Sequence, residues 1–238
     1  GLTAEHATIS RGLEFLRRQP GPDSTYELAT CTQALAAAGL PADIGRIGTL
    51  AAQLERRQLR RGADPRRRGA WNYGGHRQRE AWWDNSNTQF AILGLREAAF
   101  AGIPIDEETW RLAQEHWMLP AAGGGAPLKR GQQSGWQYLD MRGGGGTGSM
   151  TAAGIASLAI TSGFVRSLKG ETADGDIDCC GVDESDRDVQ LAIEAGCRWM
   201  ATRFTIGANP GDTRWALYYL YGLESAGRLT GSRFFGDH

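Results

Sequence analysis

The chain has 238 residues, of which 41% are hydrophobic, and its formal net charge is −1. This length and composition predict a globular chain with enough surface to bury a core. Four cysteines are too few for a disulfide scaffold, and no run approaches the roughly 18 apolar residues that span a bilayer.

Eight helices are predicted in chain order, alternating between two kinds. The first kind has one apolar face and suits an outer layer; its members are residues 4–19, 42–58, 106–118 and 186–204. The second kind is apolar almost all round and must be buried on every side; its members are Thr25–Gly39, Thr88–Gly102, Ser149–Gly163 and Thr213–Gly227. No segment shows the strict alternation of a half-buried strand. We therefore expect one all-α domain over residues 1–238, either complete or part of a longer chain.

The four all-round apolar helices form an internal repeat. Their final glycines lie 61 to 64 residues apart, and each has Ser or Thr fourteen positions earlier. We expect the hydroxyl to cap the first turn and the glycine to stop the helix in the left-handed conformation. Such a period predicts a repeat architecture, because each copy buries its apolar surface against the neighbouring copies.

The segments between these helices carry the polar and aromatic signals. Two Trp-x-Tyr triplets, Trp71 to Tyr73 and Trp136 to Tyr138, lie in Gly-rich joins 65 residues apart. An arginine run from Arg56 to Arg68 ends an outer helix, where it opposes the helix dipole favourably. The alternative, a nucleic-acid patch, conflicts with the net charge of −1. The acidic loop 168–185 has spaced oxygen ligands but lacks the Gly and Glu of a calcium loop.

The alternating helices and aromatic-Gly joins resemble the squalene cyclase and protein prenyltransferase repeat. Arg11 to Gln19 is similar to the first half of a cyclase "QW" repeat, and Gln132 to Trp136 to the second half. The resemblance, which extends to a bacterial branch without assigned function, implies an α/α toroid with inner helices around a central cavity. Such rings need more hairpins than four inner helices supply, so the ring is either an open arc or completed by further sequence.

The catalytic motifs of that family are missing. The cyclase Asp-x-Asp-Asp acid has its nearest counterpart in Asp176-Ile177-Asp178-Cys179, which lacks the last carboxylate. Where prenyltransferases place a zinc-binding histidine, this chain has Arg214 and Trp215. Cys180-Gly181-Val182-Asp183 does not match the thioester string Cys-Gly-Glu-Gln. We therefore predict no cofactor and no metal.

The candidate site is an aromatic and polar rim at the start of the second inner helix. Apolar walls with a few placed polar groups are typical of ligand sites. The rim is predicted to comprise Trp71, Tyr73, His76, Trp82, Trp83, Asn85, Asn87, Gln89, Trp136 and Tyr138, with Asp84 as a weak catalytic candidate. Packing of these aromatics between hairpins, and capping by Asp84, are the structural alternatives. His6 and His116 lie on outer helices and are expected at the surface.

Three functional hypotheses follow. The first is a binding module for an apolar or glycan-like small molecule, or for a segment of a partner protein. The second is an isoprenoid cyclase-like enzyme with Asp84 as the acid. The third is a glycan hydrolase or lyase, for which Asp84 would need Asp23 or Asp212 across the cavity. Whether the chain is an enzyme stays open. Its compartment also stays open, because a removed export signal and a Cys197 disulfide to Cys179 or Cys180 are both compatible with the sequence.

Overall fold

A computed structural model describes residues 2–19, 21–61, 64–74, 82–121, 128–139, 145–169, 184–233 and 235–236. These residues form α-helices and short 3₁₀ turns, with no strand among them, so the predicted all-α class is confirmed. The α-helices are α1 Ala7–Arg18, α2 Thr25–Ala38, α3 Ile44–Arg57, α4 Asn85–Phe100, α5 Glu107–Ala121, α6 Gly148–Lys169, α7 Glu184–Ala201 and α8 Ala216–Thr230. The 3₁₀ turns are η1 Pro41–Asp43 and η2 Pro65–Arg67.

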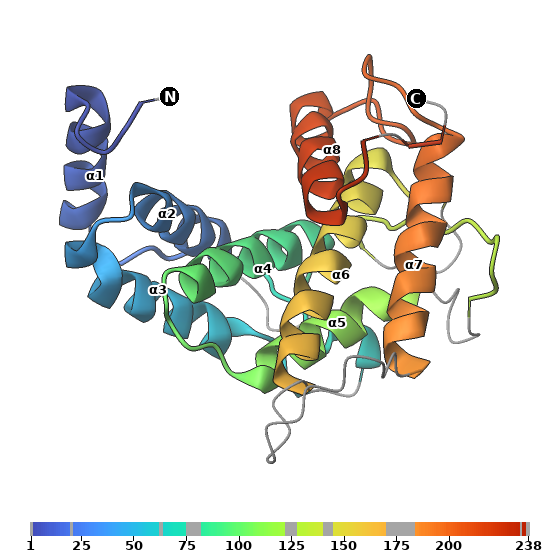
Figure 1. The fold of residues 1–238 in the computed structure, drawn as a ribbon, viewed down its shortest axis with the longest axis horizontal. Coiled ribbons are helices and arrows are strands. Elements are labelled where there is room, and N and C mark those ends of the chain that lie inside the picture. The colour runs from blue at the N-terminus through green and yellow to red at the C-terminus, as the bar shows by residue number, and fades with distance from the viewer. Residues whose placement is uncertain are drawn as a thin grey trace.

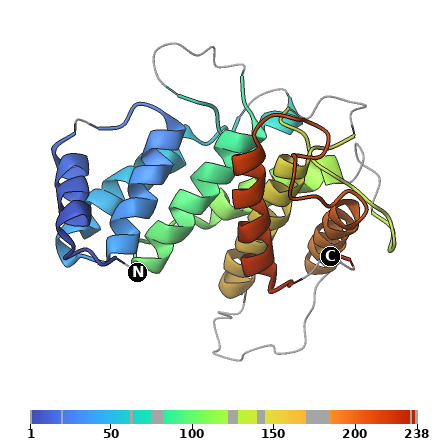
Figure 2. The same cartoon turned by 90° about the horizontal axis from the view of Figure 1, so that it is seen from above.

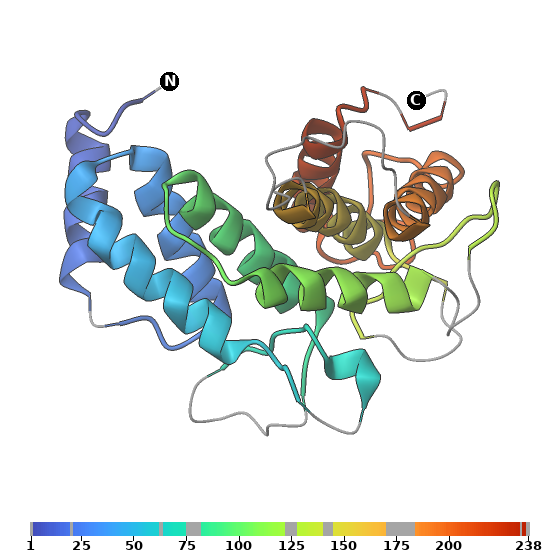
Figure 3. The same ribbon diagram turned by 60° about the horizontal axis from the view of Figure 1, so that its bottom comes forward.

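The four repeated helices are successive neighbours in space. α2 packs against α4, α4 against α6, and α6 against α8. The amphipathic helices lie beside this row: α3 contacts α2 and α4, while α5 and α7 contact α6. Figure 1 shows α1 and α7 towards opposite ends of the elongated molecule, and Figure 3 shows α3 and α5 in succession along one side. The alternation predicted from the sequence is therefore present in three dimensions.

The helices begin differently from the prediction. Ser24, not Thr25, caps α2 by accepting from the Glu27 backbone N–H, and Glu27 completes the capping box. Asp84, not Thr88, caps α4. Residue 215, and not Thr213, is the N-cap of α8, and it makes no side-chain cap bond. In α6 the first-turn N–H of Met150 bonds the hydroxyl of Thr147 rather than that of Ser149.

The prediction that a glycine ends each repeated helix is confirmed for α2 and α4 and is wrong for α6 and α8. Gly39 and Gly102 have φ of 65° and 86° just beyond α2 and α4. Gly163 and Gly227 lie inside α6 and α8, which continue to Lys169 and Thr230. The extension of α6 carries Phe164, whose ring stacks on Trp110 at a centroid distance of 4.2 Å. This packing outweighs the helix propensity cost of about 1 kcal/mol for an interior glycine.

The Trp residues of the two Trp-x-Tyr triplets are buried, and each links an amphipathic helix to one of the repeated helices. The indole Nε1 of Trp71 donates to the Leu54 carbonyl at 2.7 Å, and its backbone N–H donates to Thr88 Oγ1 at 3.1 Å. The second triplet repeats both bonds: Trp136 donates to the Trp117 carbonyl at 2.9 Å and to Thr151 Oγ1 at 3.2 Å. The Thr88 hydroxyl, which we expected as a cap, thus anchors the first loop, and the Thr151 hydroxyl anchors the second.

The burial of α8 departs from the prediction. Helix α4 is buried over most of its surface, whereas α8 buries only Tyr219, Gly222 and Ala226 among its described residues. Leu217 of α8 is 84% exposed. The reason is geometric: α6 is the main neighbour of α8, as Figure 2 shows, and it covers one side alone.

Helix α6 has the length and apolar character that a membrane-crossing helix would require, alone among the helices of the described ranges. Of its most apolar window, 83% is buried inside the protein. That burial is typical of a core helix, so this weak signal agrees with the prediction of no transmembrane segment.

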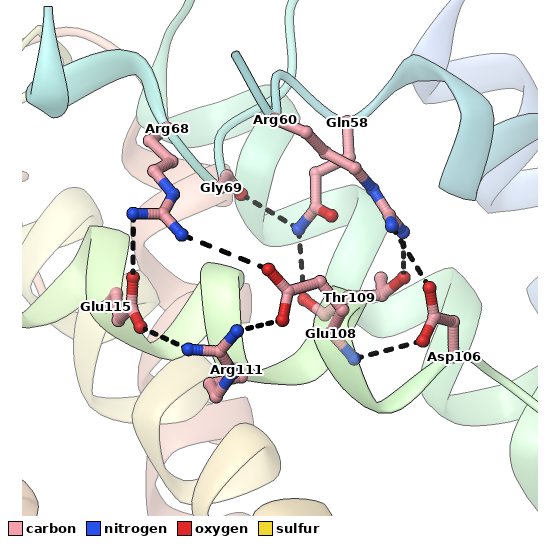
Figure 4. A network of polar contacts seen from close by, with 9 residues as sticks. All are labelled: Gln58, Arg60, Arg68, Gly69, Asp106, Glu108, Thr109, Arg111 and Glu115. Carbon is pink, nitrogen blue, oxygen red and sulfur yellow. Dashed lines mark hydrogen bonds and ion pairs between the residues drawn. The ribbon is translucent and has the colours of Figure 1, made fainter.

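The arginine run is held by carboxylates and backbone carbonyls. Arg60 pairs with Asp106 at 3.0 Å, and Arg68 lies 3.9 Å from both Glu108 and Glu115 (Figure 4). Arg57 donates to the Asp23 carbonyl at 2.9 Å. The network fastens the loop after α3 to the first turns of α5, so these charges are compensated locally.

Candidate functional site

The predicted rim residues divide into packed and accessible side chains. Trp71 and Trp136 are fully buried, and Trp83 is 8% exposed with its ring edge-on to His116 at 5.1 Å. Trp82 is 52% exposed, and His76 lies outside the described residues. The tryptophans of the predicted site are therefore mainly structural.

Tyr73 and Tyr138 do meet, as the rim hypothesis requires. Their hydroxyls are 3.3 Å apart although the residues are 65 positions apart in sequence. Backbone bonds place them: the Tyr73 carbonyl accepts from Thr25 N at 2.8 Å, and the Tyr138 carbonyl from Asn85 N at 3.0 Å. Each Trp-x-Tyr loop thereby joins the N-termini of two neighbouring repeated helices, α2 and α4 or α4 and α6.

Asp84 is a fully buried helix cap. Its Oδ1 accepts from the Asn87 backbone N–H at 2.8 Å and from the Ser86 hydroxyl at 2.5 Å. Its Oδ2 accepts from the Asn87 side-chain amide at 2.8 Å. Both oxygens therefore serve the first turn of their own helix, where the helix dipole also favours a carboxylate.

Replacing Asp84 with alanine is expected to lower the free energy of unfolding by roughly 2–4 kcal/mol, because the cap is lost and buried Ser86 and Asn87 donors are left unpaired. Asp84→Asn keeps an acceptor for the Asn87 N–H and should cost less than half as much. Urea unfolding of both variants measures this difference. Equal losses would show that the negative charge, rather than the cap acceptor, is what the site needs.

His116 is buried rather than at the surface, which corrects the prediction. It is 1% exposed, and its Nε2 lies 2.8 Å from Asn85 Oδ1. The Asn85 amide nitrogen donates to the Gln137 carbonyl at 2.7 Å, so the atom of Asn85 that faces the imidazole is the oxygen Oδ1. Because Oδ1 can only accept a hydrogen bond, the proton of the neutral imidazole is on Nε2 of His116. Burial lowers the pKa of His116 to about 4. Hydrogen bonding to the backbone of Arg66 and Arg68 acts in the opposite direction and raises the pKa, but its effect is smaller.

A cluster of tyrosines surrounds the start of α4. Burial raises the pKa of Tyr26, Tyr138 and Tyr218, and the Asp84 carboxylate raises each further. These hydroxyls are therefore protonated at neutral pH and act as neutral hydrogen-bond donors. The Tyr218 hydroxyl already donates to Gln89 Oε1. The sequence prediction included Gln89 but missed Tyr26 and Tyr218.

Aromatic rings continue from this cluster along α4. Tyr26 contacts Tyr73 and Phe90, with ring centroids 5.7 and 4.6 Å apart. Phe90 in turn lies 6.1 Å from the rings of both Tyr218 and Tyr221 on α8. Apart from Tyr73, these residues lie in helices whose sequences are apolar almost all round, so no facial pattern in the sequence separates them from core positions.

Two adjoining hollows lie between α2, α4 and α8, and we name them together the α4 groove. The first has a volume of about 530 Å³ and is lined by Thr30, Gln33, Phe90, Leu217, Tyr218 and Tyr221. The second, of about 520 Å³, is lined by residues that include Gln33, Leu93, Arg96, Glu97, Tyr221, Glu224 and Arg228. Gln33 and Tyr221 line both hollows and so mark their junction. Each volume falls within the range of small-molecule sites.

The acids proposed as partners of Asp84 are paired with arginines. Asp212 Oδ1 accepts from Arg214 N and Nε, each at 3.0 Å, and Arg57 lies 4.0 Å from Asp23. Within the described part of the chain, no three His, Cys, Asp or Glu side chains are grouped as metal ligands would be. The acidic loop with its candidate calcium ligands, and Cys179 and Cys180, lie in residues 170–183, outside the description.

Comparison of the chain with protein-family models, with curated proteins and with solved structures gives no match in any of the three.

Proposed function

We propose that this chain is a ligand-binding module built on the α/α-toroid plan, and that its ligand lies in the α4 groove. The observation that supports this function best is the groove itself, which runs along an inner helix and has aromatic rings at one end and polar side chains at the other. This combination is the usual composition of a binding site. The alternating helices and the paired Trp-x-Tyr loops support the toroid plan.

The contacts of the acids favour binding over the two enzymatic hypotheses. A cyclase acid must deliver its proton to the substrate, whereas both Asp84 oxygens accept hydrogen bonds from Ser86 and Asn87. A hydrolase needs two carboxylates facing the scissile bond. Asp23 and Asp212 instead face arginines, and in the groove Glu97 and Glu224 pair with Arg96 and Arg228.

Calorimetric titration tests the proposal, with farnesol and cellohexaose as an apolar and a hydroxylated probe. We expect at least one probe to bind, and Tyr221→Ala to weaken that binding by about tenfold or more, since a lost aromatic contact is worth roughly 1.4 kcal/mol. Phe15→Ala is the matched control, because Phe15 is a 61% exposed aromatic residue on α1. Failure of both probes, or equal affinity in Tyr221→Ala, would contradict the proposal.

A further inference from the structure

We propose that the ligand of the α4 groove is an uncharged saccharide chain, recognised by stacking on Phe90 and Tyr221 and by hydrogen bonds at the junction of the two hollows. This inference rests on the function proposed above and specifies its ligand.

The charges of the groove favour a neutral ligand. Arg96 pairs with the adjacent Glu97, and Arg228 pairs with Glu224 at 3.0 Å. The first pair lies within α4 and the second within α8. The groove therefore presents two positive and two negative side chains, and each has a partner of opposite charge. The four side chains sum to no net charge, so the groove has no excess charge that would attract an ionic ligand. A neutral ligand fits this balance.

The polar groups of the groove disfavour an apolar ligand. Tyr221 and Gln33 bring a hydroxyl and an amide to the junction, and the Gln33 amide also donates to the Ala29 carbonyl at 3.2 Å. Covering such groups with hydrocarbon removes water without replacing its hydrogen bonds. A hydroxylated ligand supplies both donors and acceptors.

The rings of the groove provide broad faces for sugar rings. The Phe90 ring on α4 lies 6.1 Å from the rings of Tyr218 and Tyr221 on α8, with interplanar angles of 26° and 31°. These rings form a platform that is apolar on its face and carries hydroxyls at its edge, which matches the alternating character of a sugar ring. Because a second hollow of similar volume continues beyond the junction, the groove suits a chain rather than a single ring.

The experiment compares cellohexaose, maltohexaose and an N-acetylglucosamine hexamer with farnesol, by calorimetry on the full chain. We expect at least one hexasaccharide to bind and farnesol not to bind. Tyr221→Phe should weaken saccharide binding roughly three- to tenfold, which corresponds to one neutral hydrogen bond, and Phe90→Ala by more than tenfold. The Phe15→Ala control should bind as the unchanged protein does.

The outcomes separate this inference from the proposed function. Farnesol binding that Tyr221→Ala abolishes, without saccharide binding, would overturn the saccharide and leave the groove as a binding site. Saccharide binding that Tyr221→Phe and Phe90→Ala leave unchanged would overturn the stated recognition. Absence of binding by all four probes would overturn the saccharide inference, and a circular dichroism spectrum of each variant shows that a loss of binding is not a loss of fold.

Discussion

Trp136→Ala is expected to lower the free energy of unfolding by about 3–5 kcal/mol, the loss typical of truncating a fully buried aromatic residue. Trp136 is 0% exposed and donates hydrogen bonds to the Trp117 carbonyl and to Thr151. Two glycines shape its slot: a Cβ at Gly154 would lie 2.5 Å from the indole, and one at Gly196 would lie 2.8 Å from it. The indole thus joins α5, α6 and α7, and its removal leaves a cavity between them.

Urea-induced unfolding followed by circular dichroism measures this loss. Trp82→Ala is the matched control, because Trp82 is 52% exposed and its replacement should change the free energy of unfolding by no more than about 0.5 kcal/mol. A loss below about 1 kcal/mol for Trp136→Ala would show that the loop does not staple the helices as described.

Acidification is expected to destabilise the fold through His116. Its pKa is about 4 in the folded protein and 6.5 in an unfolded chain. Between these values the unfolded chain binds a proton that the folded protein does not, so stability falls as the pH falls from about 6.5 to 4. The full loss is on the order of 3 kcal/mol, since one pKa unit corresponds to 1.36 kcal/mol.

The difference between two variants isolates this contribution from that of other titrating groups. In His116→Gln the free energy of unfolding should depend less steeply on pH between 6.5 and 4.5 than in the unchanged protein. His6→Gln is the matched control, because it removes an exposed histidine at the start of α1. An identical slope in the His116→Gln protein would mean that the imidazole is solvated and charges freely.

Local patterns in the sequence predicted the helices well and their ends poorly. A run that is apolar almost all round indicates a buried helix directly, so α2, α4 and α6 could be placed from composition. The ends depend on packing: α6 passes through Gly163 because Phe164 reaches Trp110. Likewise, the sequence made Thr88 a cap, while the fold uses its hydroxyl to hold Trp71.

None of the predicted rim residues lines the α4 groove, whose lining side chains come from α2, α4 and α8. Tyr73, Tyr138, Asn85 and Gln89 belong to repeated or adjacent motifs, so their pattern drew attention to the start of α4. His116 was placed at the surface because it lies on a helix of the outer kind, yet Trp83 and Asn85 cover it in the structure. No local signal reports such coverage.

The sequence by itself determined the helical class, the alternation of two kinds of helix and the aromatic loops, because these follow from the order of apolar and polar residues along the chain. Only the tertiary structure decided which inner helix stays partly exposed and where a groove forms. The Tyr218 hydroxyl and Gln89 are 129 residues apart, and their hydrogen bond exists because α8 packs on α6 and faces α4 across the groove. The α4 groove is therefore a product of helix packing, which brings together side chains that lie far apart in the sequence.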